Sequence, residues 1–200
     1  MNTFVFRAIY LAIMFLGFSL PAQAFNFKPY AGVGLGDFII DAGLGSKAAF
    51  GGYGILGGDF NQNVGVELRV GSTGSTTGTV MVPQGFPDGG ITLVPTPAKI
   101  GVDWFVSYLL KLQYPFANNF RIYGLLGGTT LKSKFTFTGK TDYKTNTTLS
   151  YGGGIDYNLG NQWLVGVDGM IYSNKANTNP GANYQGLDVW AFTGTVKYAF

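Results

Sequence analysis

From residue 25 onward, apolar residues recur at every second position of this chain rather than at every third or fourth. The segment 102–114 shows this most clearly, because large apolar side chains on one face alternate with Asp103, Phe105, Ser107, Leu109, Lys111 and Gln113 on the other. A period of two predicts a β-strand with two different faces. An apolar face opposite a charged one, over so long a strand, is typical of a barrel wall between lipid and a polar interior.

The same alternation predicts eight strands, several of them close to the 9–11 residues that a membrane-spanning strand needs. They are 27–37, 48–60, 63–72, 102–114, 120–131, 148–159, 163–173 and 188–200. The glycine-rich segments 27–37, 48–60 and 120–131 leave the assignment of their two faces open.

The predicted connections alternate strictly between short and long. The segments 59–63, 115–119 and 159–162 are short and rich in Asn, Asp and Gly, which favour turns. The segments 38–47, 72–100, 132–147 and 174–187 are long and polar. Bacterial outer-membrane barrels have short periplasmic turns and long extracellular loops. The sequence therefore predicts an all-β fold, an eight-stranded antiparallel up-and-down transmembrane barrel with both termini on the periplasmic side.

The composition supports this fold class and argues against several functions. Charged residues are 12% of the chain, aromatic residues 16%, and glycine 32 of 200 positions, whereas soluble domains average about 25% charged residues. The net charge of +3 is small and dispersed, so no nucleic-acid partner is expected. The chain has no cysteine and no histidine. Without these nucleophiles and bases we expect no enzyme activity, no cofactor and no metal site.

The first 24 residues have the pattern of a cleaved signal peptide, which leaves a barrel domain over 25–200. Arg7 precedes an apolar stretch from Ala8 to Leu20, and Ala22-Gln23-Ala24 is a small-x-small cleavage signal. The apolar stretch is short for an anchoring helix. We expect cleavage after Ala24, so N-terminal sequencing of protein from outer membranes should begin at Phe25. A mature protein that still begins with Met1 would contradict this prediction.

Equal numbers of acids and bases are predicted to point into the barrel. They are Glu67, Asp103, Asp156 and Asp168 with Arg69, Lys111, Arg121 and Lys197. Side chains fill the interior of an eight-stranded barrel, and buried charges must pair. The group is either a structural plug of ion pairs or the lining of a narrow gated pore.

Several segments resemble a known family. "FKPYAGVGLGDF", the Asn-rich short turns, "GGGIDYNL" and the terminal "VKYAF" are similar to the eight-stranded outer-membrane barrels of the OmpA-like, opacity-protein type. The resemblance implies a bacterial outer-membrane location. It also implies that a terminal aromatic signal, here Phe192, Val196, Tyr198 and Phe200, is read by the barrel-assembly machinery. No peptidoglycan-binding domain follows the barrel, so cell-wall anchoring is not expected.

The predicted loop 132–147 carries four lysines, Lys132, Lys134, Lys140 and Lys144. They are either contacts to lipopolysaccharide phosphates or part of a solvated loop. The leading functional hypothesis is a structural or surface-interaction role, in which the protein supports the membrane and its loops adhere to a host-surface ligand. The alternative is a small porin or a channel for small or hydrophobic solutes. A periplasmic soluble β-protein is the remaining option.

Overall fold

The computed structural model describes residues 27–41, 46–85, 91–137, 139–174 and 187–200, so the predicted signal peptide lies outside the described residues. All regular elements in these ranges are β-strands. Their bounds are β1 Lys28–Asp41, β2 Lys47–Asp59, β3 Val64–Thr73, β4 Ser75–Gly85, β5 Ile91–Pro115, β6 Phe120–Phe137, β7 Lys140–Gly160, β8 Trp163–Ser173 and β9 Asp188–Ala199. Within the described part of the chain, no helical segment has the length and hydrophobicity that crossing a bilayer requires.

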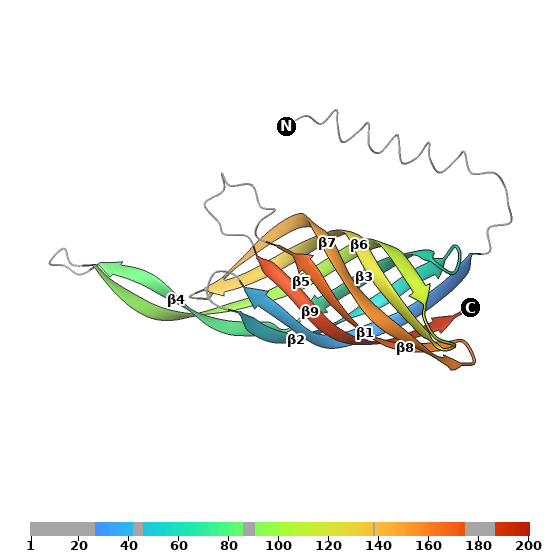
Figure 1. Ribbon diagram of the computed structural model, residues 1–200. Helices are drawn as coiled ribbons and strands as arrows, with labels where there is room; N and C mark the ends of the chain where they lie inside the picture. The colour runs from blue at the N-terminus through green and yellow to red at the C-terminus, as the bar shows by residue number, and fades with distance from the viewer. Residues whose placement is uncertain (1–26, 42–45, 86–90, 138, 175–186) are drawn as a thin grey trace, which may run out of the picture.

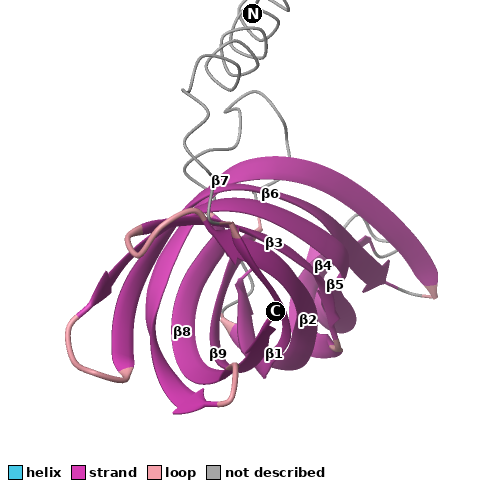
Figure 2. Ribbon diagram, turned by 90° about the vertical axis from the view of Figure 1, so that its right-hand side faces the viewer, coloured by secondary structure: helices cyan, strands magenta, loops and turns pink. Residues whose placement is uncertain are grey.

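Eight of the strands form a closed antiparallel ring (Figures 1 and 2). The last strand β9 pairs with the first strand β1, starting at Tyr30↔Ala199, and β3 pairs with β5. The remaining strand, β4, pairs with β5 and projects with it beyond the ring, at the end away from the C-terminus. The predicted eight-stranded antiparallel barrel is thus confirmed, and its closure gives every strand of the ring two partners.

The outer surface of the ring is apolar, as a lipid-facing wall requires. Aliphatic side chains such as Leu35, Leu56 and Leu112 are more than half exposed. Exposed aromatic side chains lie near both ends of the strands, where a membrane barrel carries its interfacial girdles. Those at the short-turn end include Tyr114, Phe120, Trp163 and Phe200, and those toward the other end include Phe50, Trp104 and Trp190.

The short turns are held by local asparagine contacts and by left-handed backbone. Asn61 Oδ1 accepts hydrogen bonds from the backbone N–H groups of Asn63 and Val64, at 2.8 and 2.9 Å. In the last turn, Gly160, Asn161 and Gln162 have φ angles of 83°, 49° and 71°. Glycine and asparagine adopt this region at the lowest steric cost, which explains their presence in the turn.

Two of the predicted long loops are wrong, because they are mostly strand. In 72–100, β4 and the first part of β5 form a hairpin, from Ser75↔Gly101 to Gly85↔Ile91. In 132–147, β6 and β7 stay paired from Lys132↔Thr145 to Phe137↔Lys140. Both segments are rich in threonine and other β-branched residues, and such hairpins need no membrane around them because their strands hydrogen-bond to each other. The predicted connection 38–47 is also shorter than expected, because 38–41 belong to β1 and Lys47 begins β2, while 42–45 lie outside the described residues. Most of the connection 174–187 lies outside the described residues.

Candidate functional site

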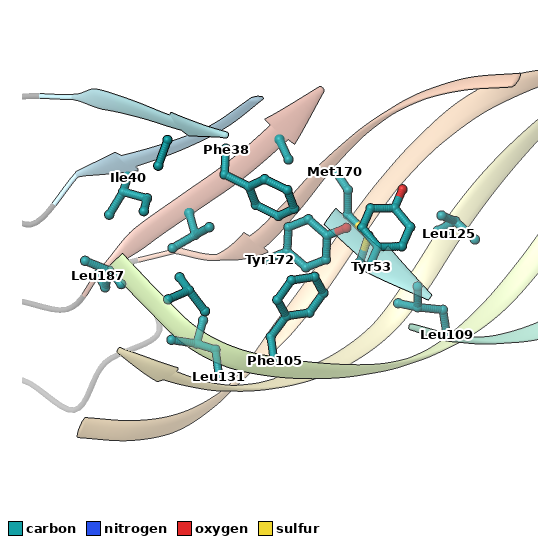
Figure 3. Packing of buried hydrophobic residues seen from close by; sticks show 14 of the residues in the cluster. Phe38, Ile40, Tyr53, Phe105, Leu109, Leu125, Leu131, Met170, Tyr172 and Leu187 are labelled. Atoms are coloured by element: carbon teal, nitrogen blue, oxygen red, sulfur yellow. The ribbon is translucent and has the colours of Figure 1, made fainter. Parts of the chain in front are cut away.

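The interior of the barrel has two layers of different chemistry. The half nearer the short turns contains charged side chains, which come from β2, β3, β5, β6, β7, β8 and β9. The half nearer the projecting hairpins contains aromatic and aliphatic side chains, and this apolar cluster continues between the charges through Leu109 and Leu125 (Figure 3). Sequence periodicity identified inward positions but not this layering, which depends on the height of each residue in the closed barrel.

Arg69 is the centre of the inner part of the charged layer. Its Nε lies 2.5 Å from Glu67 Oε1 and its Nη2 lies 2.7 Å from Asp168 Oδ2, and all three side chains are at most 1% exposed. Tyr53 accepts a hydrogen bond from Arg69 Nη1 at 2.9 Å, and Thr193 donates one to Asp168 Oδ1 at 2.6 Å. One guanidinium therefore joins two buried carboxylates, as its planar fork of donors permits.

Asp156 is the centre of the outer part of this layer. Lys197 Nζ donates to its Oδ1 at 3.1 Å, and Lys111 Nζ and Arg121 Nη2 each lie 3.5 Å from its Oδ2. Lys197 Nζ also lies 4.0 Å from Glu67 Oε2, which links the two parts. These ion pairs thus form one continuous group across six strands of the barrel, and Asp59 on β2 adds a seventh.

The group ends at the short-turn mouth of the barrel with an ion pair between Arg121 and Asp59, 3.0 Å apart. Their side chains are 22% and 12% exposed, unlike the sealed charges further in. A hollow of about 320 Å³ opens beside them, lined by residues that include Lys28, Phe120 and Leu164. Solvent therefore has access to this ion pair from the short-turn end of the barrel.

The structure places seven of the eight predicted interior charges in this group. The prediction for the eighth, Asp103, is wrong, because this residue lies on the outer surface. Opposite β6, Val102 pairs with Ser133 and Trp104 with Lys132, so Asp103 is the extra residue of a β-bulge. Its exposed carboxylate lies 3.3 Å from Lys132 Nζ on the outer surface. The bulge also turns Val102 inward, to 2% exposure. The sequence prediction continued the alternation of inward and outward residues unchanged through position 103. It therefore could not show that the bulge reverses which residues point inward on the two sides of that position.

Asp59 is an interior charge of this group that the sequence did not predict. It belonged to a predicted turn, "DFNQN", but it is the last residue of β2 and is buried. Tyr53 and Ile55 on the same strand are buried and share its phase. Alternation carried through to the end of the glycine-rich segment 48–60 would have identified Asp59.

Two tyrosines reach the charged layer because glycines make room for their rings. The Tyr30 hydroxyl donates to Glu67 Oε2 at 2.9 Å. A Cβ at Gly57 would lie 2.5 Å from the Tyr30 ring, and one at Gly34 would lie 2.4 Å from the Tyr53 ring. Real Cβ atoms do not approach carbon so closely, so a larger residue at either position would have to displace the tyrosine ring.

We expect Gly34→Ala to displace the Tyr53 ring and to lower the free energy of unfolding by about 1–3 kcal/mol, the usual range for overpacking. Gly194→Ala is the matched control, since a Cβ there would meet no atom within 4 Å. Urea unfolding of both refolded variants, followed by tryptophan fluorescence, measures the difference. Equal stability of the two variants would show that Tyr53 repacks without loss.

The apolar layer closes the interior above the charges. The rings of Phe105 and Tyr172 have centroids 4.8 Å apart, and Phe38 lies 5.6 Å from Tyr172 (Figure 3). All three side chains are at most 2% exposed. Beside them, the hydroxyls of Ser107 and Thr129 bond at 2.7 Å. Aliphatic residues continue the layer outward, including Ile40, Ile100, Leu131 and Val189.

The four lysines predicted to face lipopolysaccharide do not share one face. Lys132 and Lys134 have the phase of Leu126, which faces lipid. Lys140 and Lys144 have the phase of Ser150, which faces the interior. The expectation of a single group of four is therefore corrected to two outward lysines. Lys132 Nζ lies 4.2 Å from the centroid of the neighbouring Tyr143 ring.

The predicted terminal signal lies on the outer face of β9. Phe192, Val196 and Phe200 are between 42% and 69% exposed. Tyr198 packs its ring against those of Trp163 and Phe200, with centroids 5.0 and 5.5 Å apart. The backbone N–H of Phe200 donates to the Pro29 carbonyl at 3.0 Å. The last residue of the chain therefore takes part in closing the barrel.

Comparison with known proteins agrees with this fold. A family model described as an outer membrane protein beta-barrel domain matches residues 9–200. The chain belongs to this family. It is therefore an outer-membrane β-barrel protein, and the resemblance seen in the sequence is confirmed. No curated protein matches the sequence.

Solved outer-membrane proteins share the fold at low sequence identity. Ail, the attachment invasion locus protein of Yersinia pestis, in complex with the heparin analogue sucrose octasulfate, is 16% identical with a TM-score of 0.56, covering 87% of this chain and 99% of Ail. Neisserial surface protein A is 11% identical with a TM-score of 0.58, covering 87% and 97%. OprG from Pseudomonas aeruginosa is 15% identical with a TM-score of 0.54, covering 86% and 96%. These likenesses concern the fold alone.

Proposed function

We propose that this outer-membrane barrel acts at the cell surface, by supporting the membrane and by contacting other molecules through its extracellular strands, and that it does not pass solutes through its centre. The observation that carries the proposal is the filled interior. A continuous ion-pair group occupies one half and a packed aromatic layer the other. A solute would have to break buried ion pairs and also displace Phe105 and Tyr172.

The test is the conductance of the refolded barrel in a planar lipid bilayer. We expect no steady conductance, because removing the partner of a buried charge costs several kcal/mol and the network therefore stays closed. A steady, large, ohmic conductance would contradict the proposal. The porin or solute-channel function would then take its place.

Lipopolysaccharide is the partner that we propose for the outward lysines. Lys132 and Lys134 lie above the lipid-facing surface, where their ammonium groups can pair with lipid phosphates. We expect the double variant Lys132→Ala/Lys134→Ala to retain less lipopolysaccharide on purification than wild type. The matched control is Lys140→Ala/Lys144→Ala, which should retain the wild-type amount. Equal loss from both variants would show that net charge alone decides the retention.

A host-surface ligand remains part of the proposal, and charge alone does not favour a polyanionic one. Among the described residues toward the extracellular ends of the strands, lysines and aspartates are nearly balanced. The lysines are Lys47, Lys99, Lys132, Lys134, Lys140 and Lys144, and the aspartates are Asp37, Asp41, Asp103, Asp142 and Asp188. Ail was solved in complex with a heparin analogue. In this protein the extracellular ends of the strands carry almost as many aspartates as lysines, so they present little excess positive charge for such a ligand.

A further inference from the structure

The hollow at the short-turn mouth has no part in the proposed surface function. Its volume is about 320 Å³, near the lower end of the range for pockets that hold small ligands. It lies between the start of β1 and the turns that join β5 to β6 and β7 to β8, at the end of the barrel that faces the viewer in Figure 2. Because the short turns of outer-membrane barrels face the periplasm, we expect a ligand of this hollow to come from that compartment.

The walls of the hollow are joined to one another by backbone hydrogen bonds. The Asn158 N–H donates to the Asn119 carbonyl at 2.8 Å and so connects the two turns. Asn158 Oδ1 accepts a hydrogen bond from the Gly160 N–H, and the Gln162 carbonyl accepts one from the Ala199 N–H, both at 2.9 Å. The walls are therefore formed before any ligand binds, and binding does not have to supply the free energy that ordering them would cost.

Positive charge is in excess around the hollow. Lys28 and Arg121 line it, and Asp59 is the one acidic residue of its lining. Neither oxygen of Asp59 is offered to a ligand, because Oδ2 accepts from Arg121 Nη1 at 3.0 Å and Oδ1 is sealed from solvent. Lys28 is exposed, and within the described part of the chain its ammonium group has no ion-pair partner. An anionic group in the hollow would therefore meet an uncompensated positive charge.

Three asparagine side chains around the hollow are available to a ligand. Asn118, Asn119 and Asn161 line it, and their side-chain amides form no hydrogen bond with any other residue that the structure describes. Each amide carries donors and an acceptor, which is the complement of a peptide group. The lining also contains Phe120 and Leu164, so an apolar side chain of a ligand has a surface to pack against.

We propose that this hollow binds the free carboxyl end of a periplasmic peptide. Lys28 pairs with the terminal carboxylate, and the asparagine amides bond to the last peptide group. Phe120 and Leu164 contact the last side chain. Capture of a C-terminal carboxylate is one of the recurring ways in which proteins recognise peptides. The feature that is recognised here is the chain end, so the rest of the peptide sequence is loosely specified.

A sugar fits the hollow less well than a peptide end. Sugar hydroxyl groups donate hydrogen bonds, and an ionised carboxylate is the strongest acceptor that a protein offers them. The one carboxylate of the lining, that of Asp59, is already bound to Arg121. An uncharged sugar would also leave the ammonium group of Lys28 without a counter-charge.

The test uses the mature chain that begins at Phe25, refolded into lipid nanodiscs, which leave both ends of the barrel accessible. The probe is the peptide Gly-Ser-Gly-Ala-Leu with fluorescein at its amino end and a free carboxyl group at the leucine. We expect the barrel to raise the fluorescence anisotropy of this probe. The same peptide with an amidated carboxyl end should bind at least about tenfold more weakly, because it lacks the charge that strengthens each hydrogen bond.

Two variants locate the binding site. Lys28→Gln removes the unpaired ammonium group and should weaken binding about three- to fivefold, the usual effect of one exposed ion pair. Its matched control is Lys47→Gln, which makes the same change in net charge at the opposite end of the barrel, where β2 begins, and should bind as wild type does. Asn161→Gly removes one amide but keeps the turn, because glycine readily adopts the φ of 49° found at Asn161. It should weaken binding about threefold, the effect of one hydrogen bond.

Each other outcome overturns the inference. Equal binding of the amidated peptide would mean that the carboxylate is not recognised, and unchanged binding by Lys28→Gln and Asn161→Gly would place the probe elsewhere. No binding by wild type would mean that the hollow takes no peptide from outside. If a chain begun at Phe27 then bound the probe, the first residues of the mature chain would be the occupant.

Competition distinguishes the remaining class of ligand. We expect N-acetyl-glycyl-leucine to displace the probe and N-acetylglucosamine to leave it bound. The opposite result would identify a sugar site and refute the peptide site. None of these outcomes alters the proposed surface function, which bilayer conductance tests separately.

Discussion

Arg69→Ala is expected to lower the free energy of unfolding by about 3–5 kcal/mol, the typical cost of removing one partner from a buried ion pair. The variant would leave Glu67 and Asp168 without the guanidinium that joins them at 2.5 and 2.7 Å. Both carboxylates are sealed from solvent, so water cannot replace the lost contacts. Denaturant unfolding of the refolded barrel in lipid vesicles measures the loss.

The control for this prediction is Val70→Ala on the same strand. Val70 is 50% exposed on the lipid-facing surface, so its truncation removes little packing inside the barrel. Arg69→Ala should also show more frequent channel openings in a planar bilayer, because the charged layer is disrupted. If Arg69→Ala has the stability of Val70→Ala and shows no openings, the ion pairs do not hold the interior closed.

Deletion of Phe200 is expected to cause a large loss of outer-membrane protein while synthesis continues. The family resemblance implies that the terminal aromatic is read during assembly, and the ring is 69% exposed at the end of β9, where another protein can reach it. Its single backbone hydrogen bond to Pro29 contributes only about 1 kcal/mol. Cell fractionation with the heat-modifiable gel shift measures folded protein in the outer membrane.

Two comparisons separate recognition from stability in this experiment. Phe200→Tyr keeps a terminal aromatic and should assemble normally. Phe116→Ala removes another exposed aromatic ring from the same end of the barrel and should have little effect. The deletion variant, refolded in detergent, should unfold close to wild type. A normal yield of folded deletion variant in cells would show that Phe200 is dispensable for assembly.

The fold was predictable because one face of each barrel strand belongs to the apolar outer surface and the other face to the interior. In β9, Phe192 and Val196 face outward while Thr193 and Lys197 are buried, as alternation predicts. Two-residue periodicity is a local property of the backbone, so it survives without knowledge of the neighbours. Polarity was a poorer guide outside the membrane, where hairpins such as Lys132–Thr145 alternate less clearly and were predicted as loops.

The sequence by itself determined the barrel, its eight strands and the inward direction of seven charges. The tertiary structure alone decided which charges meet, because Arg69 and Asp168 are 99 positions apart and the stagger of the closed ring brings them together. The tertiary structure also determined the β-bulge that places Asp103 on the outer surface and the burial of Asp59. It determined as well that the rings of Tyr53 and Tyr30 pack against Gly34 and Gly57. Each of these depends on a cross-barrel neighbour or a register shift, and a pattern along one strand contains neither.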